Sequence, residues 1–76
     1  MLLAEIKKGQ QAEITAVQAS DFREKLLEMG CVPGARVSLA LRAPLGDPCA
    51  YMIDGYCLSM RKKEARLIEV KIITGE

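Results

Sequence analysis

The sequence predicts a mainly β fold, a small antiparallel β-barrel of about five strands with one short α-helix after the first strand. Short segments with alternating apolar and polar residues recur along the chain, whereas only one segment has the clear period of an amphipathic helix. Glycine and proline residues separate these segments, and no helix recurs between strands as it would in a parallel sheet. An antiparallel sheet curled on itself is therefore expected.

Length and composition favour one folded domain that covers residues 1–76. Apolar residues make up 50% of the chain, which is more than a disordered chain carries. The 11 basic and 10 acidic residues leave a formal net charge of +1, so no strong field draws the protein onto nucleic acid or an anionic bilayer. We therefore expect recognition by shape and local contacts, and no nucleic-acid partner.

The amino terminus and the cysteines indicate a cytoplasmic protein. The first apolar run is broken by charge too early for a secretory signal or a membrane span. The three cysteines show no Cys-x-x-Cys spacing and are odd in number, which fits reduced thiols better than disulfides or a structural zinc site. These cysteines are Cys31, Cys49 and Cys57.

The first strand is expected at residues 10–17, where Ala12, Ile14 and Ala16 alternate with other residues. The helix follows, with Ser20 as its N-cap and Gly30 at the left-handed position just beyond its end near Met29. The apolar face of this helix consists of Phe22, Leu26 and Met29.

The second strand is expected at residues 35–43, with Val37, Leu39 and Leu41 on the buried face. Residues 44–48, Pro-Leu-Gly-Asp-Pro, form a restricted loop because proline fixes φ and glycine permits a turn.

A β-hairpin is expected from residues 49–53 and 56–60, because Asp54-Gly55 is the typical two-residue signal of a type I′ turn. Counting outward from the turn gives the cross-strand pairs. They are Ile53 with Tyr56, Met52 with Cys57, Tyr51 with Leu58, and Cys49 with Met60. Cys49 and Cys57 should therefore point to opposite faces of the sheet.

Residues 61–66 suit a polar helical turn, and Ile68, Val70 and Ile72 alternate in a final strand. The complete set of elements, five short strands and one helix inserted after the first, predicts an SH3-like barrel.

Two motifs resemble the FeoA (ferrous iron transport protein A) family. The first is Leu-Leu-Glu-Met-Gly-Cys-Val-Pro-Gly at residues 26–34, and the second combines residues 43–48, the turn at Gly55 and Leu-Ser-Met-Arg-Lys-Lys-Glu-Ala at residues 58–65. The resemblance covers residues 5–73, with Cys31 and Cys57 as departures from the family pattern. It implies an SH3-like barrel that acts beside FeoB, the membrane protein whose nucleotide-hydrolysing domain supports ferrous iron uptake.

The resemblance thus implies a non-enzymatic accessory protein that interacts with the cytosolic domain of FeoB, touching the inner membrane only through FeoB. The absence of histidine and of nucleophile or phosphate-binding motifs agrees with a protein that is not an enzyme and has no cofactor. One alternative is a regulatory domain related to the SH3-like C-terminal module of iron-dependent repressors. Homo-oligomer formation stays open.

A metal carrier or sensor is a further alternative, because Met52 and Cys57 should face each other as two soft sulfur donors. Two sulfurs without histidine do not make a ferrous iron site, so no metal ligand is predicted. Cys31 is expected to be buried packing.

A partner surface is expected at three places. Leu45 would stand at an exposed loop tip, Leu27 lies off the apolar face of the helix, and the basic residues after the hairpin can contact an acidic patch. Each place has a structural alternative. The loop that carries Leu45 could be an ordinary connection, Leu27 a core residue, and the basic segment a solvated turn. The predicted partner-binding residues are Leu27, Pro44, Leu45, Gly46, Asp47, Arg61 and Lys62.

Overall fold

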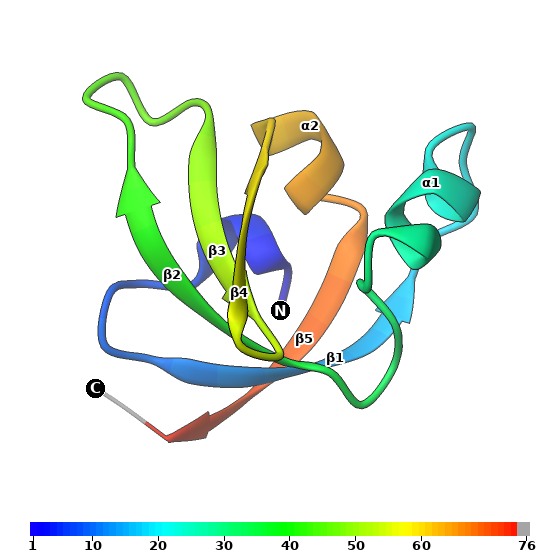
Figure 1. The fold of residues 1–76 in the computed structure, drawn as a ribbon, viewed down its shortest axis with the longest axis horizontal. Helices are drawn as coiled ribbons and strands as arrows, with labels where there is room; N and C mark the ends of the chain where they lie inside the picture. The colour runs from blue at the N-terminus through cyan, green and yellow to red at the C-terminus, as the bar shows by residue number, and fades with distance from the viewer. Residues whose placement is uncertain (75–76) are drawn as a thin grey trace.

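The computed structural model describes residues 1–74, which form one antiparallel sheet of five strands with short helical segments (Figure 1). The spatial order of the strands is β4-β3-β2-β1-β5. The strands are β1 (Gln11–Val17), β2 (Arg36–Arg42), β3 (Cys49–Ile53), β4 (Tyr56–Met60) and β5 (Ile68–Thr74). The helical segments are the 3-10 turn η1 (Leu3–Glu5) and the α-helices α1 (Arg23–Glu28) and α2 (Lys62–Ala65).

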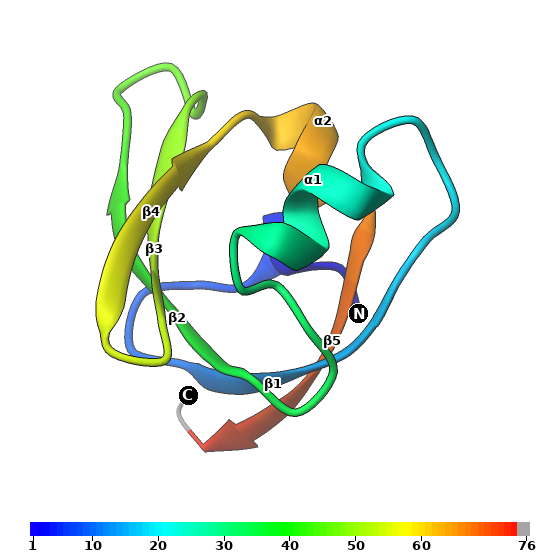
Figure 2. The same ribbon diagram turned by 45° about the vertical axis from the view of Figure 1, so that its right-hand side comes forward.

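The sheet curls around the core but does not close, so the prediction of a closed barrel is wrong for residues 1–74. β4 and β5 are the two edges of the sheet and do not pair with each other. Figures 1 and 2 show the sheet wrapping round the interior, with α2 in the connection between these edge strands. Ala65 of α2 is buried, so this connection between the two edge strands packs on the core.

The core is apolar throughout, and residues 1–74 bury no polar or charged residue. Its largest fully buried side chain is Tyr51, from the central part of the sheet. Leu3 and Ile6 are also fully buried, although no element was predicted for the amino-terminal segment. The other core residues are Ala12, Ile14, Val17, Leu26, Cys31, Ala35, Val37, Leu39, Cys49, Ile53, Met60, Ala65, Ile68 and Val70.

β1 departs from the predicted alternation near its end. The pairing of β1 with β5 shifts register between Ile14 and Ala16, which leaves Thr15 exposed and Ala16 half-buried and turns Val17 inward. The alternation of Ala12, Ile14 and Ala16 therefore does not continue as one buried face beyond Ile14. An irregularity of this kind inserts one residue into a strand and reverses the faces beyond it.

β2 contains a second irregularity that overturns another prediction. The pairing with β3 runs from Leu39 opposite Tyr51 to Leu41 opposite Ala50, so Ala40 is an extra residue. Leu39 is buried at 8% exposure, whereas Leu41 is 64% exposed. A bulge reverses the side-chain alternation, and this is why Leu41 does not share the buried face of Val37 and Leu39.

The helix α1 ends as expected and begins later than expected. Gly30 has φ +100°, and the amide of Cys31 donates to the carbonyl of Leu26 at 3.0 Å, which is a Schellman C-terminus. At the other end the Ser20 hydroxyl accepts from the amide of Phe22 at 3.1 Å, and the helix starts only at Arg23. Ser20 therefore caps the turn that precedes the helix, and its prediction as the helix N-cap is wrong.

The β3–β4 hairpin has the predicted register. Ile53 lies opposite Tyr56, Met52 opposite Cys57, Tyr51 opposite Leu58, and Cys49 opposite Met60. Asp54 and Gly55 both have positive φ, as a type I′ turn requires. Cys49 is buried and Cys57 is exposed, which confirms that they occupy opposite faces.

Candidate partner-binding surface

The loop between β2 and β3 is fixed by its own backbone. The amide of Gly46 donates to the carbonyl of Ala43 at 2.7 Å, and the amide of Ala43 donates to the carbonyl of Pro48 at 3.2 Å. The thiol of Cys49 donates to the carbonyl of Gly46 at 3.4 Å. Leu45 at the tip is 95% exposed, the highest value among the exposed large apolar residues of residues 1–74. The prediction that Leu45 is exposed is confirmed.

A second contact joins this loop to the start of α2. The amide of Lys62 donates to Oδ1 of Asp47 at 3.0 Å. The first amides of a helix lack partners within the helix, so a carboxylate at this place satisfies a donor and orients the loop. Glu64 supports the same turn, because its Oε1 accepts from the amide of Arg61 at 2.9 Å. The loop and α2 therefore form one structural unit.

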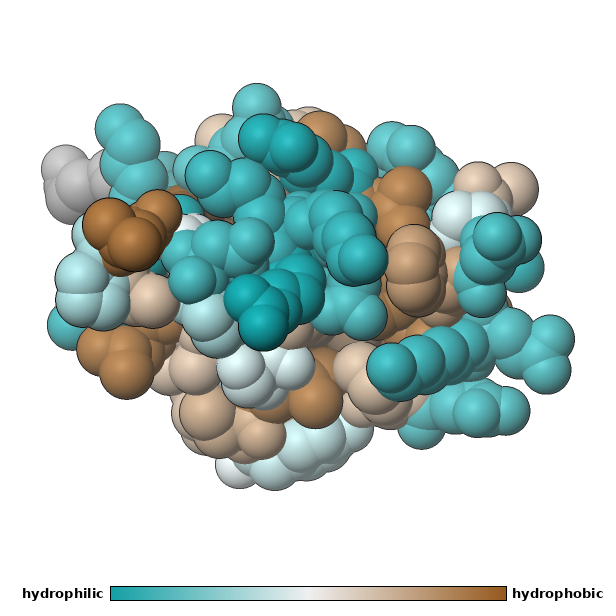
Figure 3. All heavy atoms as spheres, turned by 90° about the horizontal axis from the view of Figure 1, so that it is seen from above, coloured by the Kyte–Doolittle hydropathy of each residue, from teal (hydrophilic) through white to brown (hydrophobic). Residues whose placement is uncertain are grey.

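The charged groups beside the loop are mainly basic. Arg61 is exposed and Lys62 is half-buried, and the Lys62 ammonium lies near Gly46, since Nζ is 3.9 Å from the place of a Cβ atom on that glycine. Figure 3, seen from above this end of the molecule, shows hydrophilic side chains over the middle and apolar ones on either side. The loop thus presents an apolar tip next to basic groups.

The structure brings together six of the seven predicted partner-binding residues, all except Leu27. Leu27 lies on α1, away from the β2–β3 loop (Figure 1), and it is half-buried against the core. The six residues are Pro44, Leu45, Gly46, Asp47, Arg61 and Lys62, and we call them the loop–α2 surface.

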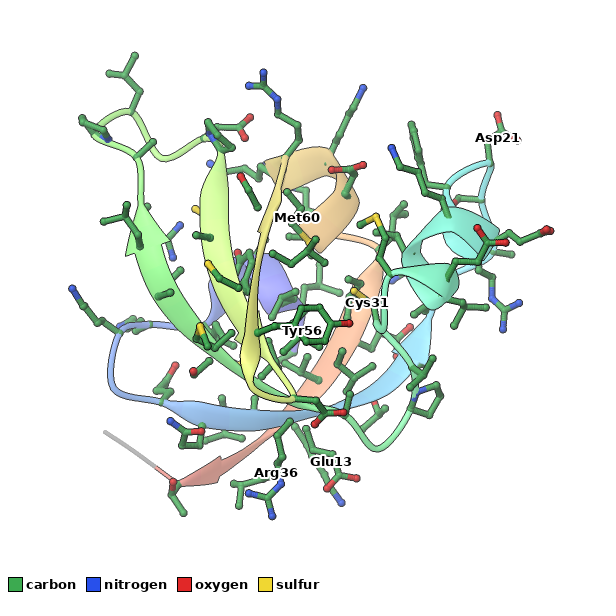
Figure 4. All side chains as sticks on the ribbon, viewed as in Figure 1. Glu13, Asp21, Cys31, Arg36, Tyr56 and Met60 are labelled. Atoms are coloured by element: carbon green, nitrogen blue, oxygen red, sulfur yellow. The ribbon has the colours of Figure 1, made fainter. Side chains whose placement is uncertain are left out.

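Two contacts that the sequence did not reveal hold α1 in place. The Tyr56 hydroxyl donates to the carbonyl of Met29 at 2.7 Å, and the Lys63 ammonium lies 5.3 Å from the centre of the Phe22 ring. Figure 4 shows Tyr56 between β4 and the segment that carries Cys31. A Cβ atom on Gly30 would collide with the Tyr56 hydroxyl. In the sequence, the feature that pointed to this region was Gly30 at the end of the helix. It did not indicate that Tyr56 would contact the helix end.

The three cysteines differ in burial. Cys31 is fully buried, as predicted, and burial together with the negative charge of Glu64 raises the pKa of its thiol to about 11. Cys57 is exposed opposite the half-buried Met52. Within residues 1–74 no group of three or more histidine, cysteine or acidic residues could hold a metal ion, and no pocket is present.

The fold and surface define a small, mainly β domain whose accessible features are loops and sheet edges. No helix in residues 1–74 is long and apolar enough to cross a membrane. The sequence model of the FeoA domain matches residues 1–72. The chain belongs to the FeoA family.

Known proteins of similar sequence and structure support this assignment. Over 76 residues, covering 99% of the chain, it is 41% identical to a Porphyromonas gingivalis fusion protein of Fe(2+) transport protein A and the Fe(2+) transporter FeoB. The chain spans only 9% of the length of that relative. The fusion links this type of domain to ferrous iron transport.

Solved structures share the fold. The solution structure of FeoA from Chlorobium tepidum has a TM-score of 0.89 at 42% identity, over 100% of this chain and 73% of that one. FeoA from Stenotrophomonas maltophilia, crystallised with zinc and described as a prokaryotic SH3 domain protein, has a TM-score of 0.82 at 25% identity, over 93% of this chain and 89% of that one. The SH3-like description of the fold is thereby supported, although the sheet of this chain does not close between β4 and β5 in residues 1–74.

Proposed function

We propose that this domain is a non-enzymatic accessory protein that binds the cytosolic part of FeoB and adjusts its assembly, nucleotide turnover or iron flux. The fusion of the two proteins in one polypeptide in Porphyromonas gingivalis supports this partner, since fused domains often work together. Binding would place the domain in the cytoplasm at the inner membrane, in contact with the bilayer only through FeoB.

The observation that carries the proposal is the rigid display of Leu45. A flexible loop loses conformational entropy when it binds, whereas a loop already fixed by hydrogen bonds loses less. Gly46 and Asp47 both make such hydrogen bonds, and the side chain of the neighbouring Leu45 is exposed to water. An apolar side chain held in this way is suited to enter a pocket on a partner.

The basic groups beside the loop indicate the chemistry of that pocket. Arg61 and Lys62 would lie at the rim of the contact, where charges mainly affect association rate and orientation. We therefore expect a FeoB surface with an apolar depression and acidic groups beside it. Asp47 would stay occupied by its bond to the amide of Lys62.

Calorimetric titration into the FeoB cytosolic domain, with and without guanine nucleotide, tests this function. Leu45→Asp should weaken binding by at least about tenfold, because a charge in an apolar pocket must be desolvated. Leu41→Asp is the matched control, since Leu41 is an exposed leucine of β2, near the same loop but outside the loop–α2 surface. Equal affinities for both variants would exclude this surface, and no binding by the unmodified protein would exclude the function itself.

A further inference from the structure

The two edges of the sheet differ in their protection against further strand pairing. β5 carries Glu69 and Lys71, and its first half is covered by the amino terminus, where Leu2 bridges to Glu69 and the amide of Val70 donates to the carbonyl of Met1 at 2.7 Å. Charges, irregular register and covering segments are the usual means by which proteins block an edge. The outer edge of β5 is therefore blocked along much of its length.

β4 has no charge and no irregular register, and its first residue contacts the end of α1 through the bond from the Tyr56 hydroxyl to the carbonyl of Met29. Its sequence, Tyr-Cys-Leu-Ser-Met, contains no charge and no proline, and its pairing with β3 is regular from Cys49–Met60 to Ile53–Tyr56. In residues 1–74 no other strand pairs with it. Figure 1 shows β4 in front of β3 with no element of the fold in front of it. This edge is open to another strand.

The hairpin geometry shows which backbone groups the open edge offers. A two-residue hairpin closes on a hydrogen-bonded pair, here Ile53 and Tyr56, and hydrogen-bonded pairs then alternate along the ladder. Tyr56, Leu58 and Met60 therefore direct their amides and carbonyls to β3. Cys57 and Ser59 direct theirs outward, which provides donors and acceptors for a new strand.

We propose that β4 pairs with β4 of a second copy of this chain, antiparallel and related by a two-fold axis at Leu58. This register places Cys57 opposite Ser59 of the second copy and Ser59 opposite Cys57. In an antiparallel ladder each such pair exchanges two hydrogen bonds, so all the outward amides and carbonyls of Cys57 and Ser59 find partners. The two Leu58 residues face each other at the axis, adding apolar contact between half-buried side chains.

Charge complementarity selects the antiparallel arrangement and a second copy as the occupant. Asp54 precedes β4 and Arg61 follows it, and both are exposed. The antiparallel register brings Arg61 of the second copy opposite Gly55 and next to Asp54, and repeats this contact at the other end. A parallel arrangement would instead bring like charges together, which is unfavourable. β4 itself carries no charge that a copy would repel.

The contact is small, so we expect a weak, concentration-dependent dimer, because stable dimers normally bury a larger and more apolar interface. Disulfide trapping can detect such pairing and its register. In the proposed dimer a Ser59→Cys variant places a thiol opposite Cys57 of the second copy, at a separation that a disulfide can span. Diamide supplies the oxidising equivalents, because it takes up the two electrons and two protons released by each new S–S bond.

Two controls fix the interpretation. In the unmodified protein, and in a Cys57→Ser, Ser59→Cys double variant, the exposed thiols of the two copies stand out of register by two residues, which a disulfide does not bridge. We expect Ser59→Cys to form disulfide-linked dimer at least about tenfold faster than either control. Equal rates in all three proteins, which would reflect random collisions of exposed thiols, or no dimer from Ser59→Cys would overturn the proposal.

Amide resonances of the unmodified protein give an independent measurement that needs no variant to fold. The Cys57 and Ser59 signals should shift with protein concentration, and Ser59→Lys should abolish the shift by placing charge on the edge. If the Cys57 and Ser59 resonances do not change with protein concentration but shift when the FeoB cytosolic domain is added, self-pairing is overturned. The β4 edge would then be assigned to FeoB.

Discussion

The loops at the two ends of β2 have similar residues but opposite roles. Residues 30–34 precede the strand and residues 43–48 follow it, and each loop contains proline and a glycine with positive φ. The first loop buries Cys31 completely, whereas the second leaves Leu45 95% exposed. Turn chemistry alone therefore does not decide whether a loop supports the core or presents a side chain.

The difference arises from what lies beyond each loop. The first loop is tied to the end of α1 through the bond from Cys31 to Leu26 and lies over the core, so its apolar side chain turns inward. The second loop extends past the end of the sheet. It contacts α2 through the hydrogen bond from the amide of Lys62 to Asp47 at the surface. A core-forming loop and a displayed loop should respond differently to the same kind of substitution.

The largest contrast is expected between two leucines of β2. Leu39→Ala should lower the free energy of unfolding by about 2–5 kcal/mol, because it leaves a cavity beside the core. Leu41→Ala, beyond the bulge, should change it by less than about 0.5 kcal/mol. Denaturant titration of both variants measures the difference, and similar losses would show that the bulge does not separate the two faces.

The next contrast concerns the glycines of the two loops. Gly30→Ala should cost about 2–3 kcal/mol, since it adds the strain of positive φ and displaces the Tyr56 hydroxyl from the carbonyl of Met29. Gly46→Ala should lower the free energy of unfolding by about 1–2 kcal/mol. It introduces the strain of a positive φ, but the new Cβ atom makes only an ordinary contact with Lys62.

A double substitution separates strain from collision at Gly30. In a Tyr56→Phe background the hydroxyl oxygen is absent, so Gly30→Ala should be less destabilising than in the unmodified protein. Thermal unfolding of the four proteins in this cycle measures the coupling. Strictly additive effects would show that Tyr56 does not restrict the choice of residue at position 30.

The buried thiol of the first loop should make stability depend on alkaline pH. Burial, and secondarily the negative charge of Glu64, raise the pKa of the Cys31 thiol from its ordinary value of 9.0 to about 11, so the unfolded chain loses this proton first as pH rises. The stabilisation is complete below pH 9 and should be lost progressively towards pH 11. Tyr51 should also make the protein less stable as pH rises, but at higher pH. Burial, and then Cys49, raise the pKa of its hydroxyl to about 12.

The contribution of Cys31 is isolated by comparison with Cys31→Ala. The difference in unfolding free energy between the two proteins should shrink as pH rises from 9 to 11, since only the unmodified protein has the shifted thiol. Denaturant titrations at a series of pH values measure this difference. A constant difference over that range would contradict the assigned pKa.

The smallest effect on stability is expected in the displayed loop. Leu45→Ala should change the free energy of unfolding by less than about 0.5 kcal/mol, because the side chain makes little contact with the rest of the protein. Denaturant titration measures this value. A loss comparable to that of Leu39→Ala would mean that Leu45 packs against the fold and is not available to a partner.

Much of the fold followed from local patterns, and the exceptions share one cause. The β3–β4 register was predictable because the turn at Asp54-Gly55 fixes every pair outward from it. The bulges at Thr15 and Ala40 were not, because each depends on pairing with a strand elsewhere in the sequence. The buried positions of Leu3 and Ile6 were missed for a related reason, since a short segment without periodicity is buried only by tertiary packing.

The candidate surface was partly predictable for the same reasons. Proline and glycine at residues 44–48 indicated a restricted loop with Leu45 at its tip, but nothing in the sequence indicated that Asp47 caps α2 and brings Arg61 and Lys62 beside it. Leu27 was assigned to the surface from helical spacing alone, and the position of α1 against the sheet half-buries it.

Local sequence was sufficient to predict the strand segments, the tight turn of the β3–β4 hairpin and the end of α1, because each depends on neighbouring residues and their backbone preferences. The tertiary structure decided which leucine of β2 is buried, that the sheet stays open between β4 and β5, and that the β2–β3 loop and α2 form one surface. These features depend on contacts between residues far apart in the chain, where the packing of the whole core outweighs local preference.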